Sequence, residues 1–255
     1  FHIKSLLINF IDSGWPDLLK QHVFVESLLT PIVKVSRLSE KLQFYNIPDY
    51  EEWKKSVGNQ NWQIKYYKGL GTSTAVEAKE YFKSLKTVGY TAKNNKDNLA
   101  IELAFKKTEA DARKDWIINA TKNFKSLDYK QAVIPIESLI NQELVLFSIQ
   151  DNIRSIPSYV DGLKPSQRKI IYACFKKNPT KKTEIKVSQL SGYVSEQTSY
   201  HHGEQSLMDT IINMSQNFVG SNNMNLLVPS GQFGTRLMGG KDASSPRYIF
   251  TYLSE

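Results

Sequence analysis

The sequence predicts a two-part fold, with a mixed α/β part followed by an α+β part. Its 255 residues, of which 40% are hydrophobic and 23% charged, suit one or two domains with hydrophobic cores and fit neither the disordered nor the membrane class. Helix-like and strand-like segments alternate early in the chain, whereas short helices separated by Gly, Pro and Asn follow Ile156-Pro157. We therefore place an α/β domain at 1–118, a helical linker at 119–150 and a second domain at 151–255.

The first part begins with an apolar-rich helical stretch at 2–11, and Pro16 marks the start of another helix. Segments 30–35, 42–45 and 64–67 have the β-branched and aromatic content of short strands, and a capped helix start lies at 49–53. This mixture predicts an α/β domain with a parallel sheet.

A mainly helical region is expected from Asp97 to about Ile149, because its apolar residues recur at spacings that suit one helix face. Pro135 and the polar stretch 119–129 interrupt that pattern. The interruption is the reason for placing a linker there.

The second part predicts three short helices and a β-ribbon. Pro165 opens the first helix, whose buried side would carry two i, i+4 pairs, Ile170 with Cys174 and Ile171 with Phe175. The second helix is expected at 187–193, and the third at 204–217 with an apolar stripe of Leu207, Ile211, Met214 and Phe218. Strand-like segments at 226–228 and 247–252 form the ribbon. Three helices followed by a ribbon are the pattern of a winged helix, and this predicts a CAP-like domain.

The charge of the chain favours an acidic partner. The net charge is +8 and the pI is about 9.3, so nucleic acid is the first candidate. Segment 164–186 holds eight basic residues and one acid, which suits either a surface that follows phosphates or an ordinary solvated helix. Within a helix-turn-helix the first interpretation gains weight, and its candidates are Lys164, Arg168, Lys169, Lys176 and Lys177.

Two further segments could contact nucleic acid. The third helix would enter a groove with its N-terminal end, where Tyr200, His201, His202, Gln205 and Ser206 lie. The segment 68–73 is glycine-rich but lacks the spacing of a phosphate-binding P-loop, so, taken alone, it is better explained as an ordinary strand-to-helix turn that needs glycine.

Cofactor sites and membrane spans have little support in the sequence. Cys174 is the single cysteine, which excludes an internal disulfide and a multi-cysteine zinc site. His201 and His202 are adjacent, so they do not face one way on a helix. No apolar run approaches the roughly 20 residues that span a bilayer. The start at Phe1, without an initiator Met or a signal peptide, indicates a fragment.

Tyr248 is a candidate nucleophile. A loop with four glycines between 231 and 240 carries Arg236 and is followed by Lys241, so we expect it to be mobile and basic. A tyrosine with a pKa near 10 attacks a phosphodiester only when cations or a base favour the phenolate. Arg247, and Arg236 or Arg168 if the fold brings them close, could supply that charge. The alternative is a packed strand residue, since the chain has 13 tyrosines.

Several segments, in order along the chain, resemble motifs of the type IIA DNA topoisomerases. They are 67–73 (YKGLGTS), 151–157 (DNIRSIP), 161–169 (DGLKPSQRK), 200–207 (YHHGEQSL), 233–236 (FGTR), 239–243 (GGKDA) and 247–249 (RYI). The residues of these motifs are similar to those of the eukaryotic branch rather than to those of bacterial gyrase.

The resemblance implies roles for individual residues. The chain would comprise the C-terminal part of a TOPRIM domain and a truncated winged-helix domain. Tyr248 would attack DNA and hold the 5′ phosphate, with Arg247 and Arg168 as electrostatic partners and with His201 and, above all, His202 helping the 3′ oxygen. The DNA backbone would lie near Lys68, Gly69, Gly71, Thr72 and Ser73.

The resemblance also implies partners and cofactors. A homodimer would act on double-stranded DNA and not on membranes, in the nucleus of a cell, or in the host nucleus or cytoplasm if the source is viral. Mg²⁺ would be bound by carboxylates upstream of Phe1, so no metal ligand is assigned in this chain, and ATP would bind another domain. The fragment alone would be inactive. The alternative from another class is a non-enzymatic winged-helix module that binds DNA.

Overall fold

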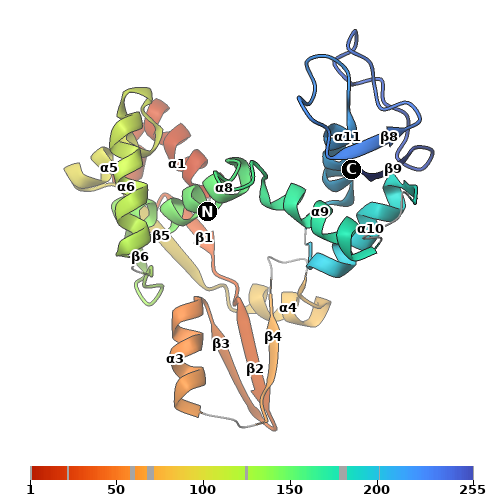
Figure 1. Cartoon of the computed structure of the whole chain (residues 1–255). Helices are drawn as coiled ribbons and strands as arrows, with labels where there is room; N and C mark the ends of the chain where they lie inside the picture. The colour runs from red at the N-terminus through yellow and green to blue at the C-terminus, as the bar shows by residue number, and fades with distance from the viewer. Residues whose placement is uncertain are drawn as a thin grey trace. The chain divides into compact units, whose positions relative to one another are not determined.

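The computed structural model describes residues 2–21, 23–57, 61–67, 72–123, 126–177, 183–200 and 202–254 (Figure 1). The chain forms two compact units, Phe1–Gln150 and Asp151–Glu255. No described helix is both long enough and apolar enough to cross a membrane.

The first unit is built around a three-stranded sheet in the order β1-β5-β6, formed by Val25–Leu28, Thr87–Thr91 and Val133–Pro135. Strand β1 runs antiparallel to β5, and β6 runs parallel to β5. Helices α1 (His2–Gly14), α2 (Pro16–Lys20) and α5 (Asn95–Phe105) contribute to one core with this sheet, together with the turns after β6. That core includes Ile8, Leu19, Tyr90, Ile101, Ile134 and Leu139.

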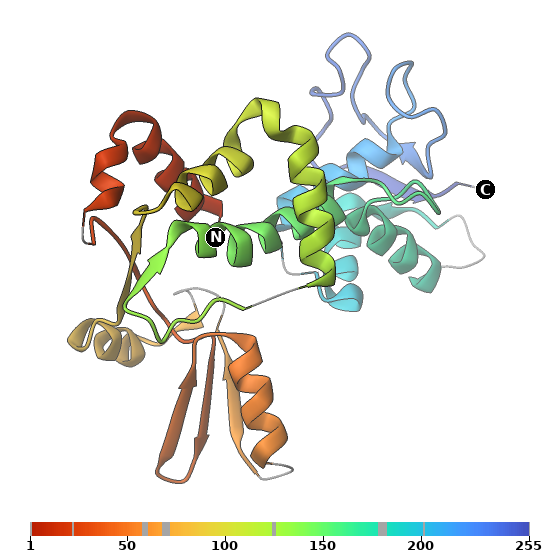
Figure 2. The same ribbon diagram turned by 90° about the vertical axis from the view of Figure 1, so that its left-hand side faces the viewer.

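A second sheet in the first unit is antiparallel throughout, in the order β3-β2-β4. Its strands are β2 (Val33–Arg37), β3 (Glu40–Phe44) and β4 (Gln63–Tyr66), and α3 (Ile47–Val57) lies along the sheet (Figure 2). Val33 and Val35 are buried against aromatic residues that include Tyr50 and Trp53. Lys34 and Ser36 alternate with them and point to the other face.

The prediction of a parallel sheet is wrong for these three strands. Only a short turn at Leu38 and Ser39 joins β2 to β3, and a turn of that length joins antiparallel strands. Parallel pairing needs a long crossover. It occurs between β5 and β6, where α5, a 3₁₀ turn (Lys107–Glu109) and α6 (Ala110–Lys122) supply one.

Segment 119–150, expected as a helical linker, is instead part of the first unit. Helix α6 continues to Lys122, and β6 adds a strand to the β1-β5-β6 sheet. Beyond it, α7 (Ile136–Leu139), a π-helical turn (Ile140–Leu144) and α8 (Val145–Ser155) follow without a break. Ile136, Leu139 and Ile140 are fully buried, because their apolar spacing packs them onto the sheet rather than leaving them solvated.

The second unit packs three helices with a small antiparallel sheet. The helices are α9 (Pro165–Lys177), α10 (Val187–Thr198) and α11 (Glu204–Ser215). The sheet has the order β7-β9-β8, formed by Ile185–Lys186, Phe250–Leu253 and Leu227–Ser230. Their shared core includes Ile170, Leu190, Leu207, Ile211, Leu227 and Ile249.

The apolar face of α9 differs in part from the expectation. Ile170, Ala173 and Cys174 form its buried stripe, and burial raises the pKa of the Cys174 thiol to about 11. Phe175 was expected beside Ile171 on the buried side, yet it is 57% exposed. Successive residues of a helix are rotated by about 100° around its axis. Phe175 therefore points away from the buried stripe, whose last residue is Cys174.

Candidate functional site

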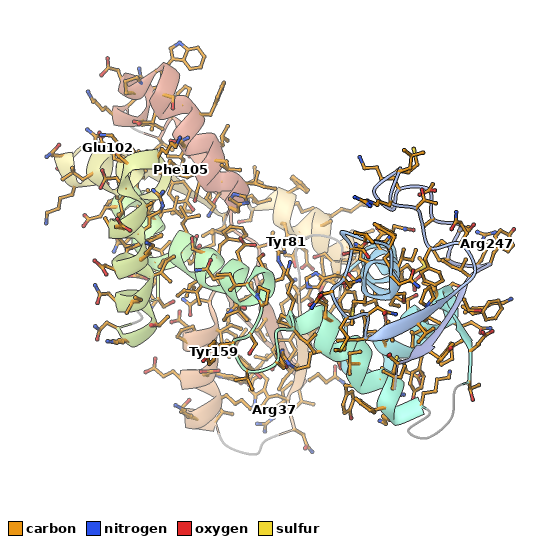
Figure 3. All side chains as sticks on the ribbon, turned by 45° about the horizontal axis from the view of Figure 1, so that its top comes forward. Arg37, Tyr81, Glu102, Phe105, Tyr159 and Arg247 are labelled. Atoms are coloured by element: carbon orange, nitrogen blue, oxygen red, sulfur yellow. The ribbon has the colours of Figure 1, made fainter. Side chains whose placement is uncertain are left out.

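Tyr248 lies on a surface turn rather than within a strand. Strand β9 begins at Phe250, and the Tyr248 side chain is 71% exposed. The alternative of a packed strand residue is therefore wrong. Neighbouring Arg247 is exposed as well, and Figure 3 shows it at the surface of the second unit. The turn exposes both a phenol and a guanidinium to solvent.

Backbone hydrogen bonds dock this turn onto the first residues of α10. Ser188 N donates to Pro246 O at 3.1 Å, and Val187 N donates to Ile249 O at 3.1 Å. The first N–H groups of a helix have no partner within the helix, so the carbonyls on either side of Tyr248 satisfy them. Ile249 is 2% exposed and packs into the core. The turn is anchored at both ends while Arg247 and Tyr248 project.

The glycine-rich loop before Tyr248 is cross-braced, although the sequence suggested a mobile segment. Thr235 donates to Asp242 twice, from its N–H and from its hydroxyl, both at 2.8 Å. These bonds, that of the backbone N–H first, lower the pKa of Asp242. Gly240 N donates to Thr235 O at 2.9 Å, and Ser244 N donates to Gln232 O at 2.9 Å. Arg236 and Lys241, which lie between Thr235 and Asp242 in the sequence, are exposed.

Arg168 is engaged by a carboxylate instead of by the tyrosine turn. Its Nε lies 2.6 Å from Asp161 Oδ2, and its Nη2 lies 2.7 Å from Asp161 Oδ1. This bidentate pair lowers the pKa of Asp161 to about 2, with the hydrogen bond from Arg168 as the largest cause. Among the described residues, no hydrogen bond or ion pair joins Arg168 to Tyr248 or Arg247. Asp161 was missed as a partner because it lies seven positions away, outside the start of α9.

The N-terminal end of α11 presents polar side chains. His202 is exposed and meets the Tyr200 ring edge-on, with ring centroids 5.4 Å apart. Gln205 Nε2 donates to Asp209 Oδ1 at 2.7 Å, and Ser206 is exposed. His201 lies outside the described residues.

The lysines of α9 do not form one uniform surface. Lys169 Nζ donates to Thr198 O at 2.9 Å, so this ammonium caps the C-terminal end of α10. Lys176 and Lys177 are exposed, and Lys177 Nζ lies 4.4 Å from the centre of the Tyr193 ring. Lys164 is half-buried just before the helix. Of these lysines, Lys176 and Lys177 are the most accessible to an anion.

In the first unit, Lys68, Gly69 and Gly71 lie outside the described residues, whereas Thr72 is exposed and Ser73 half-buried. Thr74 then begins α4 (Ala75–Lys83) with a capping box to Glu77.

Glu77 is a polar hub that the sequence interpretation missed. Its carboxylate accepts hydrogen bonds from the Tyr67 hydroxyl, from Lys65 Nζ at 3.0 Å and from Thr74 N at 2.8 Å. These bonds, that from Thr74 N first, hold the pKa of Glu77 well below its ordinary value. The signal was the Thr-x-x-Glu spacing of a capping box.

The carboxylates of the described residues do not assemble a metal site. No group of three or more His, Cys, Asp or Glu residues in the described ranges could hold a metal ion. Glu77, Asp161 and Asp242 accept hydrogen bonds within the protein instead. These residues do not fit a Mg²⁺ ion.

Two family models match successive parts of the chain. Residues 28–152 match the C-terminal associated domain of TOPRIM, and residues 154–255 match the A-type subunit of DNA gyrase/topoisomerase IV. The chain is also 54% identical to DNA topoisomerase 2-alpha of Homo sapiens over 267 residues, which cover 99% of the chain and 17% of that protein. The chain belongs to the type II DNA topoisomerases.

Other type II topoisomerases agree with this assignment. Identity to DNA topoisomerase 2-beta of Mus musculus is 55%, over 99% of the chain and 16% of that protein. The DNA-binding, cleavage and re-ligation domain of Plasmodium falciparum topoisomerase II matches with a TM-score of 0.79 and 48% identity, over 99% of this chain and 34% of that one. This topoisomerase chain therefore has the fold of a cleavage core, and it spans about a sixth of the length of the curated relatives it matches.

Proposed function

We propose that this topoisomerase chain supplies the DNA-cleaving tyrosine, Tyr248, of an enzyme that passes one duplex through a transient double-strand break in another. The observation that carries the proposal is the anchored turn, which exposes Tyr248 beside Arg247 while Pro246 O and Ile249 O are held by α10. A nucleophile on a braced turn loses little freedom when it meets its substrate.

In the cleavage step, the Tyr248 hydroxyl gives its proton to solvent, and the resulting phenolate oxygen attacks a DNA phosphorus and forms a 5′-phosphotyrosyl bond. The bond from phosphorus to the 3′ oxygen breaks, and that oxygen takes a proton, for which His202 is the proposed source. Arg247 stabilises the charge on the phosphorus oxygens. Re-ligation is the reverse, so the two steps together consume no co-reactant. Arg168 was expected as a second electrostatic partner, and its pairing with Asp161 supports an indirect role in bracing the start of α9.

The proposed DNA platform of the second unit is a winged helix over 151–255. Three helices that share a core with a small antiparallel sheet support it. The N-terminal end of α11, with His201, His202, Gln205 and Ser206, would face a groove. Phosphate contacts are proposed for Lys164, Lys176, Lys177, Arg236 and Lys241, and less directly for Lys169, which caps α10.

In the first unit, the proposed backbone contacts are Lys68, Gly69, Gly71, Thr72 and Ser73. The whole enzyme is proposed to be a homodimer that acts on duplex DNA in the nucleus. Mg²⁺, which stabilises charge on phosphate oxygens, and ATP, which drives duplex passage, are placed on other parts of the enzyme.

The test replaces Tyr248 by Phe in the full-length enzyme. Denaturing gels should show that the covalent protein–DNA adduct is lost, and native agarose gels that supercoil relaxation is lost, because Phe lacks the nucleophilic oxygen. Duplex binding, measured by fluorescence anisotropy, should change less than about threefold, since one hydroxyl adds little to a binding surface.

Tyr159→Phe is the matched control, because Tyr159 is a fully exposed tyrosine of the same unit (Figure 3). It should form adduct as the unmodified enzyme does. An adduct that persists with Tyr248→Phe would contradict the assignment. Duplex binding without any adduct in the unmodified enzyme would favour the non-enzymatic winged-helix module instead.

A further inference from the structure

A buried glutamine at the end of α11 forms hydrogen bonds to both sides of the glycine-rich loop, residues 231–240. Gln216 is 7% exposed, and its Nε2 donates to Phe233 O at 2.9 Å and to Gly240 O at 3.4 Å. Phe233 and Gly240 flank the segment that carries Arg236. One amide group therefore holds the base of the loop from both sides.

The approach of the loop to this amide leaves no room for side chains. A Cβ on Gly240 would lie 2.3 Å from Gln216 Nε2, and a Cβ on Gly234 would lie 2.5 Å from the Gly240 Cα. Both glycines also have positive φ angles, 102° and 81° for Gly234 and Gly240. The two glycines permit the contact that the amide then locks.

Gln216 is itself held by its surroundings. Its N–H donates to Ile212 O at 3.1 Å, which continues the hydrogen-bond pattern of α11. Its backbone carbonyl accepts from Asn222 Nδ2 at 2.8 Å. The backbone of Gln216 is thus held as an extension of α11, and its side-chain amide reaches into the loop.

We propose that Gln216 is a positioning residue for DNA cleavage, and that it acts by setting where Arg236 and Lys241 meet the phosphates next to Tyr248. The loop leads into the Tyr248 turn through the Ser244 N to Gln232 O bond. Loss of the amide removes the link between the loop base and α11, while the bonds within the loop and the anchors of the turn on α10 remain. The inference rests on the proposed cleavage function, since it assigns the loop a task in that reaction.

The first test is Gln216→Met in the full-length enzyme. Methionine fills a similar volume but cannot donate to the two carbonyls. At saturating duplex, adduct formed per folded molecule should fall by about tenfold to a hundredfold, because small misplacements of binding groups reduce rates on that scale. Ser215→Ala is the matched control. It removes another buried polar group at the same helix end that contacts Thr251 and not the loop, and adduct should change less than about twofold.

A double-mutant cycle separates positioning from general stabilisation. In an Arg236→Ala, Lys241→Ala background, Gln216→Met should cause much less further loss of cleavage, because the groups that it positions are gone. A purely structural glutamine would lower cleavage by the same factor in both backgrounds. Equal factors would overturn the proposal.

A second variant covers the case in which Gln216→Met does not fold. Gly240→Ala keeps the amide but pushes a methyl group into it, so cleavage should fall in the same direction. Near-normal cleavage at saturating DNA by either folded variant contradicts the inference while leaving Tyr248 in place. No adduct from the unmodified enzyme would instead sink the proposed function, and the inference with it.

Discussion

Glu77 in the first unit and Gln216 in the second each join segments that are distant in the sequence, and the two side chains differ in charge. Glu77 in the first unit is an ionised carboxylate, 17% exposed, with Lys34 at 3.6 Å and Lys65 at 3.0 Å. Gln216 in the second unit is a neutral amide that donates to carbonyl oxygens. A charge is tolerated where lysines and water surround it, whereas a buried loop base needs a neutral donor.

Glu77 also relieves a cross-strand clash in the first unit. Lys34 on β2 lies directly opposite Lys65 on β4, and like charges in that relation are unfavourable. Glu77 forms ion pairs with both lysines. The carboxylate therefore does more than cap α4, since it also makes this register acceptable.

The largest expected effect on stability is that of Glu77→Ala. It removes the hydrogen bonds from Tyr67 and Thr74 and leaves Lys34 facing Lys65, so we expect a loss of about 2 to 3 kcal/mol in the free energy of unfolding. Urea unfolding of the chain measures it. Glu80→Ala, on an exposed position of the same helix, should change the free energy by less than about 0.5 kcal/mol. Equal losses of unfolding free energy in the two variants would contradict the stabilising role of Glu77.

Gln216→Met should cost less, about 1 to 2 kcal/mol in the same measurement. The carbonyls of Phe233 and Gly240 lose a donor, yet no charge is left unpaired. The contrast with Glu77→Ala is the point of the experiment. A larger loss for Gln216→Met would mean that neutral bracing outweighs the charged hub.

The smallest expected effect is a difference in acid stability between the unmodified chain and Glu77→Gln. The pKa of Glu77 is held below its ordinary value of 4.5, so its ionisation stabilises the fold above that pH and the contribution is lost as the pH falls through the lowered pKa. The stability advantage over Glu77→Gln should be full above about pH 5 and should shrink on acidification. An advantage that is independent of pH would show that the charge of Glu77 is unimportant.

Local patterns predicted much of the secondary structure. The apolar stripe of Leu207, Ile211 and Met214 is buried in α11, and Pro16 and Pro165 each begin a helix. The strands β1, β5 and β7 were missed because they are short and their pairing partners lie far away in sequence. The antiparallel direction of β3 relative to β2 depends on the short turn between them, and composition alone did not show where that turn lies.

The site divides in the same way. Residue chemistry made Tyr248, beside Arg247, one candidate among 13 tyrosines, and the motif resemblance then implied its role. Arg168 was assigned to the tyrosine although Asp161 engages it, because the choice between two possible partners depends on distance in space. Gln216 was not predicted as a site residue, since a single glutamine belongs to no recognisable sequence pattern.

The sequence by itself determined the apolar face of α11, the basic glycine-rich segment and the tyrosine that follows an arginine, because each depends on residues within a few positions of one another. Only the tertiary structure decided that α10 holds the Tyr248 turn and that Gln216 closes the loop before it. Those contacts join residues that are distant in the sequence and meet only when the chain packs. Their hydrogen bonds form only when the donor–acceptor distance is correct to within a few tenths of an ångström.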